Sequence, residues 1–468
     1  MQPQPSDSIR EEFMDAQLAD RRLLRIAEDL AQDPQGSLPQ ASGDGGQTAA
    51  AYRFFNNDRI AAAEILAAHQ ARTRQRVAER PVVRAVSDTT SLNFADRPDT
   101  SGLGPISTSA EKMFGLWYHT DWAFSPDGLP LGLVHSQGWA RDPKQFGCRS
   151  QRHQRAIEQK ESAKWLRSLA AVQALAAQTP QTRWVMIADR EADLYELFEK
   201  TAMPPANVAR LIRAHHNRNL VETKRPLFTH VAHLRPAAEV ELQLPRRRGQ
   251  KARPARVEIR WGEVRLRAPD GKGQQRQLRL WVLEAREPRR SKHQTPMLWR
   301  RLSTAAIGTL AEALERLRWY CLRWGIEVFH RVLKSGCEVE AVQRQTAARL
   351  QRYVAVKLVI AWQVMALAQW GRQAPQRALN ELLEEVECRV LRAVERDRQK
   401  RSRAGIKRLP TKPTVHDGLW WVGRLGGHLG RRGDGLPGPL RLTRGIERLH
   451  YITLGWKIAP VANNGVYR

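Results

Sequence analysis

Two short apolar segments, each followed directly by an aspartate, constrain the fold of this chain most strongly. Residues 81–87 (Pro-Val-Val-Arg-Ala-Val-Ser) precede Asp88, and residues 184–188 (Trp-Val-Met-Ile-Ala) precede Asp189. Runs of this length and composition predict buried strands. We therefore expect Asp88 and Asp189 each to close a buried strand.

The neighbouring segments predict the order of elements in the core. Residues 114–134 contain two strand patterns around a turn at 125–128, and residues 152–178 repeat apolar side chains with a helical period. A further strand is expected at residues 208–214. Three strands, a helix, a strand and a helix, with carboxylates at two strand ends, is the order expected of an RNase H-like fold.

Residues 320–334 supply a third carboxylate. At 100° per residue, the side chains of Tyr320, Arg323, Glu327 and Lys334 fall within roughly 60° of one another on a helix, and Arg331 joins them. The opposite side carries four apolar residues, Leu322, Ile326, Phe329 and Leu333. One face therefore suits a core and the other an anionic ligand. Taken alone, the segment fits a surface helix with an ordinary Arg323–Glu327 ion pair better than it fits a binding face. The rest of the chain is what favours the binding of an anionic ligand.

Asp88, Asp189 and Glu327 are informative as a set. A single aspartate at a strand end is commonly a turn residue or a helix cap. Three converging carboxylates can instead hold two divalent metal ions about 4 Å apart, which activate a water or hydroxyl and stabilise the leaving oxygen of a phosphodiester. Oxygen ligands of this kind accept either Mg²⁺ or Mn²⁺. The three residues are therefore the candidate catalytic and metal-binding residues.

The charge of the chain favours a nucleic-acid partner. Lysine and arginine number 77 against 48 acidic residues, and the net charge of +29 is spread through the chain. Basic clusters occur at residues 246–248, 251–256, 396–408 and 431–432. Arginine presents a planar fork of donors that matches phosphate oxygens, and the excess is larger than solubility requires. We therefore expect DNA binding with a steep dependence on salt concentration.

Other features argue against several classes of protein. The four cysteines lie far apart without a Cys-x-x-Cys pair, which argues against a disulfide framework and a zinc site and suits a reducing cytosol. The first residues lack the charged and apolar regions of a signal peptide. The most apolar helix, residues 354–367, is shorter than the ~20 residues of a membrane span. The sequence contains no P-loop, so it gives no reason to expect ATP as a ligand. We expect a cytoplasmic protein with no membrane partner.

Changes in pattern divide the chain into five regions. The first region is expected to be helical, with a Gly-, Ser- and Pro-rich break at residues 36–46, and it fits either a DNA-contacting head or an ordinary bundle. A period-two pattern in the central part predicts a mostly antiparallel sheet, inserted before the Glu327 helix. The expected regions are the helical module at 1–75, the first part of the core at 76–218, the β insertion at 219–302, the second part of the core at 303–372 and a helical region at 373–468.

The spacing Tyr-x2-Arg-x3-Glu-x6-Lys at residues 320–334 resembles the YREK signature of a group of bacterial insertion-sequence transposases, which includes the transposon-five transposase. Five further segments resemble this family: 51–54 (Ala-Tyr-Arg-Phe), 88–92 (Asp-Thr-Thr-Ser-Leu), 160–165 (Lys-Glu-Ser-Ala-Lys-Trp), 189–193 (Asp-Arg-Glu-Ala-Asp) and 424–427 (Arg-Leu-Gly-Gly). Each match is short, but together they follow the family order over nearly the whole chain.

The resemblance implies a DDE transposase that cuts an element out of DNA and joins it to target DNA. Asp88, Asp189 and Glu327 would hold two Mg²⁺ or Mn²⁺ ions per active site. The amino-terminal module would bind the terminal inverted repeats, and the carboxy-terminal helices would pair two protomers into a homodimer. The implied setting is the cytoplasm of a bacterium, in association with the nucleoid.

The resemblance also implies five DNA-binding residues, which are Tyr320, Arg323, Lys334, Arg213 and Trp299. Arg331 is a further candidate because it shares the helix face of Tyr320, Arg323 and Lys334. Tyr320, Arg323 and Lys334 would contact phosphates at the transposon end, and Arg213 matches an arginine that touches DNA. Trp299 matches a tryptophan on which a flipped base stacks, an arrangement that helps excision through a hairpin. The alternative for Trp299 is a buried aromatic side chain within a strand.

Three departures from the family pattern bear on these expectations. Arg300 and Arg301 stand where the family has an apolar strand, which leaves the packing of that strand open. Gly325 and Val328 replace more polar residues beside the glutamate, and residues 442–445 lack a tryptophan expected at the dimer contact. Besides transposition, two functions stay open: a decayed or repurposed transposase that only binds DNA, and a metal-dependent nuclease without strand transfer.

Overall fold

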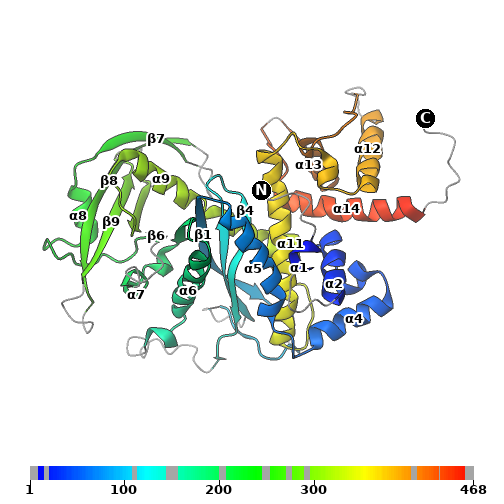
Figure 1. Ribbon diagram of the computed structural model, residues 1–468, viewed down its shortest axis with the longest axis horizontal. Helices are drawn as coiled ribbons and strands as arrows, with labels where there is room; N and C mark the ends of the chain where they lie inside the picture. The colour runs from blue at the N-terminus through cyan, green and yellow to red at the C-terminus, as the bar shows by residue number, and fades with distance from the viewer. Residues whose placement is uncertain are drawn as a thin grey trace.

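The computed structural model describes residues 9–14, 21–97, 99–107, 113–143, 156–199, 207–244, 253–269, 277–288, 296–401, 408–431 and 433–458. Within these ranges the chain is a mixed α/β protein with one ten-stranded sheet, helices packed against it and further helices near both chain ends (Figure 1). In Figure 1 the strands of the insertion lie on the side of the molecule away from the terminal helices.

The first half of the sheet contains the two predicted apolar strands as neighbours. Its strands are β1 (Val82–Asn93), β2 (Gly104–Pro105), β3 (Phe114–Phe124), β4 (Pro130–Trp139), β5 (Arg183–Ala188) and β6 (Val208–Arg213). β4, β3 and β1 pair antiparallel, whereas β1, β5 and β6 pair parallel. The helix expected at 152–178 begins only at Ala163, as α6 (Ala163–Gln178), because Ile157–Gln159 form a separate 3-10 turn.

The prediction that Asp88 closes its strand is wrong. β1 continues beyond Asp88 to Asn93, because its antiparallel pairing with β3 extends to that residue although its parallel pairing with β5 ends at Val86. Asp88 therefore lies just past the point where β1 loses β5 as a neighbour. Asp189 does follow the end of β5, as predicted, and its side chain accepts a backbone N–H at 2.9 Å to cap the turn Arg190–Ala192.

The insertion continues the same sheet. Its strands are β7 (Ala238–Leu244), β8 (Arg253–Arg267), β9 (Gln277–Arg286) and β10 (Leu298–Ser303). All pair antiparallel, which confirms the predicted sheet, and β10 also pairs antiparallel with β6 of the core. The sequence did not predict α8 (Leu227–His233), which packs on β8 and β9. The basic residues 246–248 lie outside the described residues, as do parts of the clusters at 251–256, 396–408 and 431–432.

The segment that carries Glu327 is not one continuous helix. It consists of the end of α9 (Leu310–Cys321), α10 (Trp324–Arg331) and a π-helical turn (Val332–Gly336). Between α9 and α10 the hydrogen bonds span three residues, as from the Gly325 N–H to the Leu322 carbonyl at 2.8 Å, which tightens the chain and separates the helices. A Cβ atom on Gly325 would lie 3.1 Å from the Phe124 ring, so glycine lets α10 approach β3 closely.

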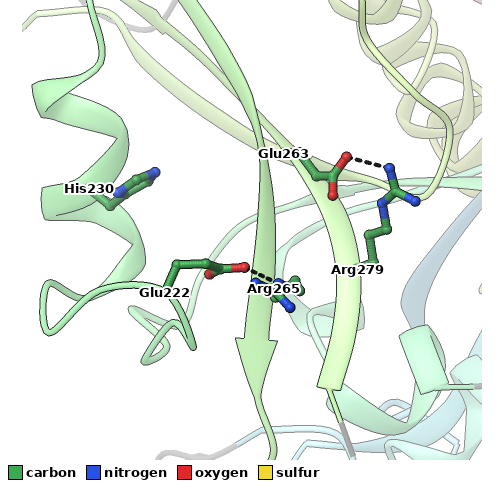
Figure 2. A pocket seen from close by; sticks show the side chains of 5 residues that line it. All are labelled: Glu222, His230, Glu263, Arg265 and Arg279. Atoms are coloured by element: carbon green, nitrogen blue, oxygen red, sulfur yellow. Dashed lines mark hydrogen bonds and ion pairs between the residues drawn. The ribbon is translucent and has the colours of Figure 1, made fainter.

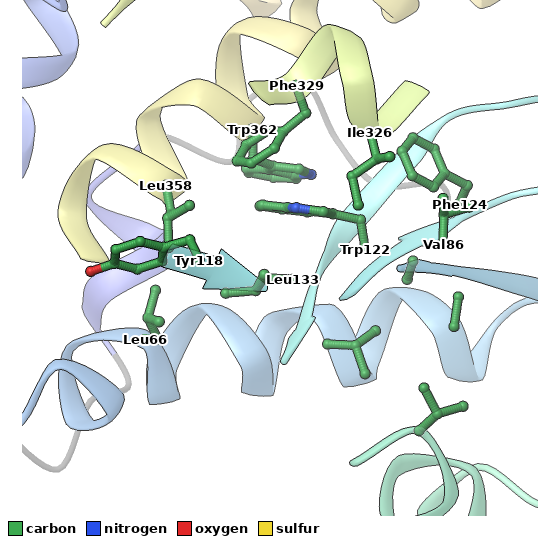
Figure 3. Packing of buried hydrophobic residues seen from close by; sticks show 14 of the residues in the cluster. Leu66, Val86, Tyr118, Trp122, Phe124, Leu133, Ile326, Phe329, Leu358 and Trp362 are labelled. Carbon is green, nitrogen blue, oxygen red and sulfur yellow. The ribbon is translucent and has the colours of Figure 1, made fainter. Parts of the chain in front are cut away.

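Apolar packing holds α10 on the sheet. The rings of Trp122, on β3, and Phe329, on α10, have centroids 4.3 Å apart, and both residues are almost completely buried. Ile326 and Trp362 lie beside this pair (Figure 3). The indole of Trp362, on α11 (Ala347–Gln373), donates to the Pro130 carbonyl at 2.9 Å. Residues from both halves of the core therefore form one apolar cluster.

The long helix α11 is a central element of the fold. By length and composition it could cross a membrane, yet 78% of its most apolar window is buried inside the molecule. Its buried charges bind the amino-terminal helices: Lys357 Nζ donates to the Pro34 carbonyl at 2.8 Å, and the Arg352 guanidinium donates to the carbonyls of Phe55 and Ile60 at 2.9 and 2.6 Å. The apolar composition of α11 is thus used in core packing.

The amino-terminal region is helical, as predicted, in its described residues. Its helices are α1 (Glu11–Met14), α2 (Arg21–Gln32), α3 (Leu38–Ser42), α4 (Gly45–Asn56) and α5 (Ala62–Ala78). The expected break at residues 36–46 contains α3, because Ser37 and Gln40 form a capping box that starts a short helix there.

A buried polar cluster connects α1 to the core. Glu12 binds Arg76 and accepts from His69 Nδ1 at 2.5 Å, and all three side chains are buried. The Leu133 N–H, on β4, donates to His69 Nε2 at 3.0 Å. Burial lowers the pKa of His69 to about 3, so the ring is neutral and its single proton lies on Nδ1, toward Glu12. The amino-terminal helices are therefore fixed to the sheet.

The carboxy-terminal region is also helical, as predicted. Its helices are α12 (Glu385–Lys400), α13 (Val415–Leu425) and α14 (Pro439–Ile458), which pack around a second apolar cluster. The Tyr451 hydroxyl, on α14, donates to Asp33 Oδ2 at 2.7 Å. The two terminal regions therefore contact each other.

We expect Trp122→Ala to lower the free energy of unfolding by ~3–5 kcal/mol, because it removes a fully buried ring from the contact between β3 and α10. The control is Leu429→Ala, since Leu429 is 68% exposed between α13 and α14 and should change the same quantity by no more than ~0.5 kcal/mol. Denaturant unfolding followed by circular dichroism measures both. Equal effects of the two substitutions would contradict the packing described here.

Candidate active site

Arg323 connects two of the three predicted carboxylates. Its Nη1 lies 2.9 Å from Asp88 Oδ2, and its Nη2 forms an ion pair with Glu327 Oε1. Asp189 follows β5, the strand beside β1, and its negative charge acts on Asp88 together with that of Glu327. The structure thus brings together Asp88, Asp189 and Glu327 from β1, β5 and α10.

The environment of Asp88 disfavours its negative charge. Burial raises its pKa from 3.8 to about 6, although the charge of Arg323 and a 2.8 Å hydrogen bond from the Thr89 N–H oppose the shift. The neighbouring charges of Asp189 and Glu327 raise the pKa further. A cation placed among these carboxylates would stabilise their ionised forms.

The three carboxylates fit a hard divalent cation by their chemistry, since Mg²⁺ and Mn²⁺ bind carboxylate oxygens. Within the described ranges, however, no three His, Cys, Asp or Glu side chains are arranged as metal ligands. Here the Arg323 guanidinium is the cation that lies between Asp88 and Glu327. Arg323 contacts one oxygen of each carboxylate, so a metal ion that bound both of these oxygens would displace its guanidinium.

A buried polar cluster that the sequence analysis missed supports β1 behind Asp88. Asp121, on β3, is fully buried and pairs in register with Ser87. It accepts from the hydroxyls of Ser87 and Ser168, the latter at 2.7 Å, and from His135 Nδ1 at 2.9 Å. Burial alone would raise the pKa of Asp121, but these hydrogen bonds and nearby histidine charge hold it below its usual value. The signal in the sequence was the presence of polar residues, Ser87 and Asp121, inside mostly apolar strand patterns.

His330 connects the Glu327 helix to the strand opposite Asp88. Its Nε2 lies 3.3 Å from the Thr120 hydroxyl, and Thr120 is the register partner of Asp88. Burial, and then the positive charge of Lys334, lower the pKa of His330 to about 3, so the ring is neutral. This contact and the apolar packing of α10 together place Glu327 near Asp88.

Three predicted DNA-binding residues gather around one unexpected arginine. Arg213 is exposed at the end of β6, Tyr320 is half-buried on α9, and Trp299 is half-buried on β10 against the apolar cluster of the insertion. The Arg301 guanidinium carbon lies 3.5 Å from the ring centre of Tyr320 and 5.7 Å from that of Trp299. Arg301 is also the register partner of Arg213.

The packing of β10, which the sequence left open, depends on two different uses of arginine. The Nε of Arg300 lies 2.6 Å from Oε2 of the buried Glu284, and its guanidinium covers the Phe228 ring at 4.5 Å. Arg301, the next residue along the strand, projects to the opposite face and stacks on Tyr320. One arginine is therefore paired with a carboxylate and the other with aromatic rings.

The remaining predicted DNA-binding residues lie on the carboxy-terminal side of Glu327. Lys334 Nζ lies 3.7 Å from Glu340 Oε1, which also accepts the Asn93 N–H at 2.7 Å, so Lys334 is near the end of β1. Arg331 is exposed in the last turn of α10. Among the described residues, Arg331 forms no ion pair or hydrogen bond with the three carboxylates.

A pocket of about 440 Å³ lies in the insertion, separate from the three carboxylates (Figure 2). It is lined by Glu222, His230, Glu263, Arg265 and Arg279. Arg265 pairs with Glu222, and Arg279 pairs with Glu263 at 2.6 Å. Because each arginine has a carboxylate partner, the pocket offers little excess charge for an anion.

Comparisons with known proteins concern mainly the amino-terminal helices. Residues 6–60 match the protein family described as "Transposase DNA-binding". This match supports a DNA-binding module of the transposase type there. One similar solved structure is the cryo-EM structure of a piggyBac transposase synaptic complex with hairpin DNA, with 10% identity, 80% of this chain and 74% of that chain covered, and a TM-score of 0.39. A likeness at this score is too low to bear on fold or function.

We expect Asp88→Asn to stabilise the protein at pH 7 more than at pH 4. Because its pKa is raised to about 6 in the folded state, ionisation of Asp88 destabilises the fold; this penalty is nearly absent at pH 4 and complete above about pH 6. The gain in unfolding free energy at pH 7 should be up to ~3 kcal/mol. Urea unfolding at both pH values measures it, with the exposed Asp96→Asn as the control for loss of one charge. A gain of equal size at both pH values would contradict the raised pKa.

Proposed function

We propose that the chain is a DDE transposase of the bacterial insertion-sequence group with the YREK signature. It would bind the terminal inverted repeats of a DNA element, cut the element out through a hairpin and join it to target DNA. The observation that carries the proposal is the meeting of Asp88, Asp189 and Glu327 beside basic and aromatic side chains. The family match of residues 6–60 supports DNA binding by the amino-terminal helices.

The proposed catalytic core is RNase H-like. The strand order β4-β3-β1-β5-β6 supports it, with antiparallel pairing among the first three strands and parallel pairing among the last three. Asp88 lies on the central strand β1, and Asp189 follows its parallel neighbour β5. The insertion separates Glu327 from them in sequence, whereas the packing of α10 on β3 returns it to the same site.

Asp88, Asp189 and Glu327 would hold two Mg²⁺ or Mn²⁺ ions. Such ions, when bound, lower the pKa of an attacking water or hydroxyl and stabilise the leaving oxygen of a phosphodiester. Arg323 would compete with the ions for the same carboxylate oxygens. Its planar donors match phosphate oxygens equally well, so DNA could take the guanidinium over from the carboxylates.

The DNA-binding surface would extend from Arg213 and Tyr320 to Lys334, with Arg331 at the exposed end of α10. A net charge of +29 supports DNA as the partner. Trp299 is half-buried beside Arg301, and this partial exposure supports the proposed stacking of a base in the hairpin route.

A homodimer is proposed through the carboxy-terminal helices. Exposed apolar side chains on α14 support this proposal, namely Tyr451, Ile452, Leu454, Trp456 and Ile458. Exposed apolar surface of this kind commonly marks a protein interface. Residues 442–445, which lack the expected tryptophan, precede this patch on the same helix.

A second candidate function is DNA binding without catalysis, in a decayed or repurposed transposase. The position of Arg323 favours it, because the guanidinium already pairs with both Asp88 and Glu327. Such a protein would bind terminal repeats with strong salt dependence and would not cut them.

The test is cleavage of a DNA fragment that carries the flanking terminal repeats of the element, with Mg²⁺. We expect nicking and then a hairpin or double-strand product from the wild type. Asp189→Ala and Glu327→Ala should each reduce the rate roughly 10³-fold or more, because each removes a group that acts with the other two as a unit. Both variants should retain DNA affinity in an anisotropy assay without divalent metal.

The control is Glu158→Ala, which removes an exposed glutamate that is not one of the three candidate carboxylates. It should cut like the wild type. Full cleavage by Glu327→Ala would exclude the proposed role of that residue. Tight binding without any cut by the wild type would favour the non-catalytic candidate, and cleavage without joined products in a donor-plus-target reaction would indicate a plain nuclease.

A further inference from the structure

Arg301 is a buried cation without a carboxylate partner among the described residues. Its relative exposure is 2%, and its Nη1 donates to the Arg300 carbonyl at 2.8 Å. Its Nε is buried with no hydrogen-bond partner. A buried charge that lacks a counter-ion destabilises a fold, so its presence at this position needs a cause outside the packing of the strand.

On the other face of β10, the positive charge of the neighbouring Arg300 is compensated by a carboxylate. Arg300 has the buried carboxylate of Glu284 at 2.6 Å, and Arg286 also reaches this carboxylate at 3.1 Å. Among the described residues, Arg301 faces the rings of Tyr320 and Trp299, and its register partner is the exposed Arg213. The two faces of one strand therefore differ in charge balance, and the uncompensated charge is on the face of Tyr320.

The surroundings of Arg301 concentrate positive charge. Burial lowers its pKa to about 10, and the charges of Arg213 and Arg323 also act to lower it. Arg301 is nevertheless charged at neutral pH. Its guanidinium lies over the Tyr320 ring, and the π electrons of the ring attract the cation. This stacking holds the Tyr320 ring in one place. Arg323 is already paired with Asp88 and Glu327, so an anion in front of Tyr320 would act mainly on the charges of Arg301 and Arg213.

We propose that Arg301 is a positioning residue for a DNA phosphodiester, which binds between Arg213, Tyr320 and Arg323. Arg301 stacks on the Tyr320 ring, and its positive charge, which has no carboxylate partner among the described residues, attracts the phosphate. This inference rests on the proposed function in taking DNA as the ligand. It assigns a role to a residue at which the chain departs from the family pattern.

The test compares Arg301→Met, Arg301→Lys and Arg300→Met in two measurements. One is affinity for a fluorescent duplex that carries the terminal repeat, by anisotropy without divalent metal, and the other is the thermal unfolding midpoint of the free protein. Arg301→Met should bind roughly tenfold more weakly while its unfolding midpoint stays the same or rises, because a buried uncompensated charge is removed. Arg301→Lys should recover most of the affinity, since lysine keeps the charge on the ring.

Arg300→Met is the matched control on the same strand. It should lower the unfolding midpoint, because Glu284 loses a partner, and it should leave affinity within about twofold of the wild type. A merely structural role for Arg301 predicts the opposite pattern, with a lower midpoint for Arg301→Met and unchanged affinity, and that result would overturn the inference. So would an Arg301→Lys protein that binds no better than Arg301→Met.

Failure of the two proposals is distinguishable. A wild type that does not bind the duplex overturns both the transposase and the role of Arg301. A wild type that binds and cuts the repeat, together with an Arg301→Met variant of equal affinity, overturns the role of Arg301 alone.

Discussion

The contact between Trp122 of β3 and Phe329 of α10 is the interaction on which the site depends. It places Glu327 beside the strand that holds Asp88. The ion pair between Arg323 and Asp88, which this contact makes possible, joins residues 235 positions apart in sequence. His330 adds a hydrogen bond to the strand partner of Asp88 in the same contact. The pairing of β1 with β5 already brings Asp88 and Asp189 together, so the buried surface between β3 and α10 is needed to add Glu327 to them.

The balance of charge at the site follows from this burial. Asp88 is harder to ionise than an exposed aspartate because it is buried beside two other acids, and Arg323 compensates part of that cost. Arg301 presents the opposite case, a buried cation that only aromatic rings accommodate. Sites that bind charged ligands commonly retain such imbalance, since ligand binding then relieves it.

The terminal regions are fixed to the core by buried polar contacts. Glu12 joins α1 to α5 and β4 through His69, and Lys357 of α11 binds the carbonyl of Pro34. At the other end of the chain, Tyr451 contacts Asp33. The helices that match the transposase DNA-binding family are therefore held in a defined position relative to the three carboxylates.

The sequence by itself determined most of the core strands and helices and the identity of the candidate acids, because apolar periodicity and turn residues act within a few positions of one another. It placed Asp189 at the end of β5 correctly and anticipated the antiparallel insertion. Only the tertiary structure decided that β1 continues past Asp88, since its partner β3 is a separate segment, and that the Glu327 segment breaks beside Phe124. The surroundings of Arg301 were equally hidden, because its stacking on Tyr320 and its lack of a carboxylate partner among the described residues arise only on folding.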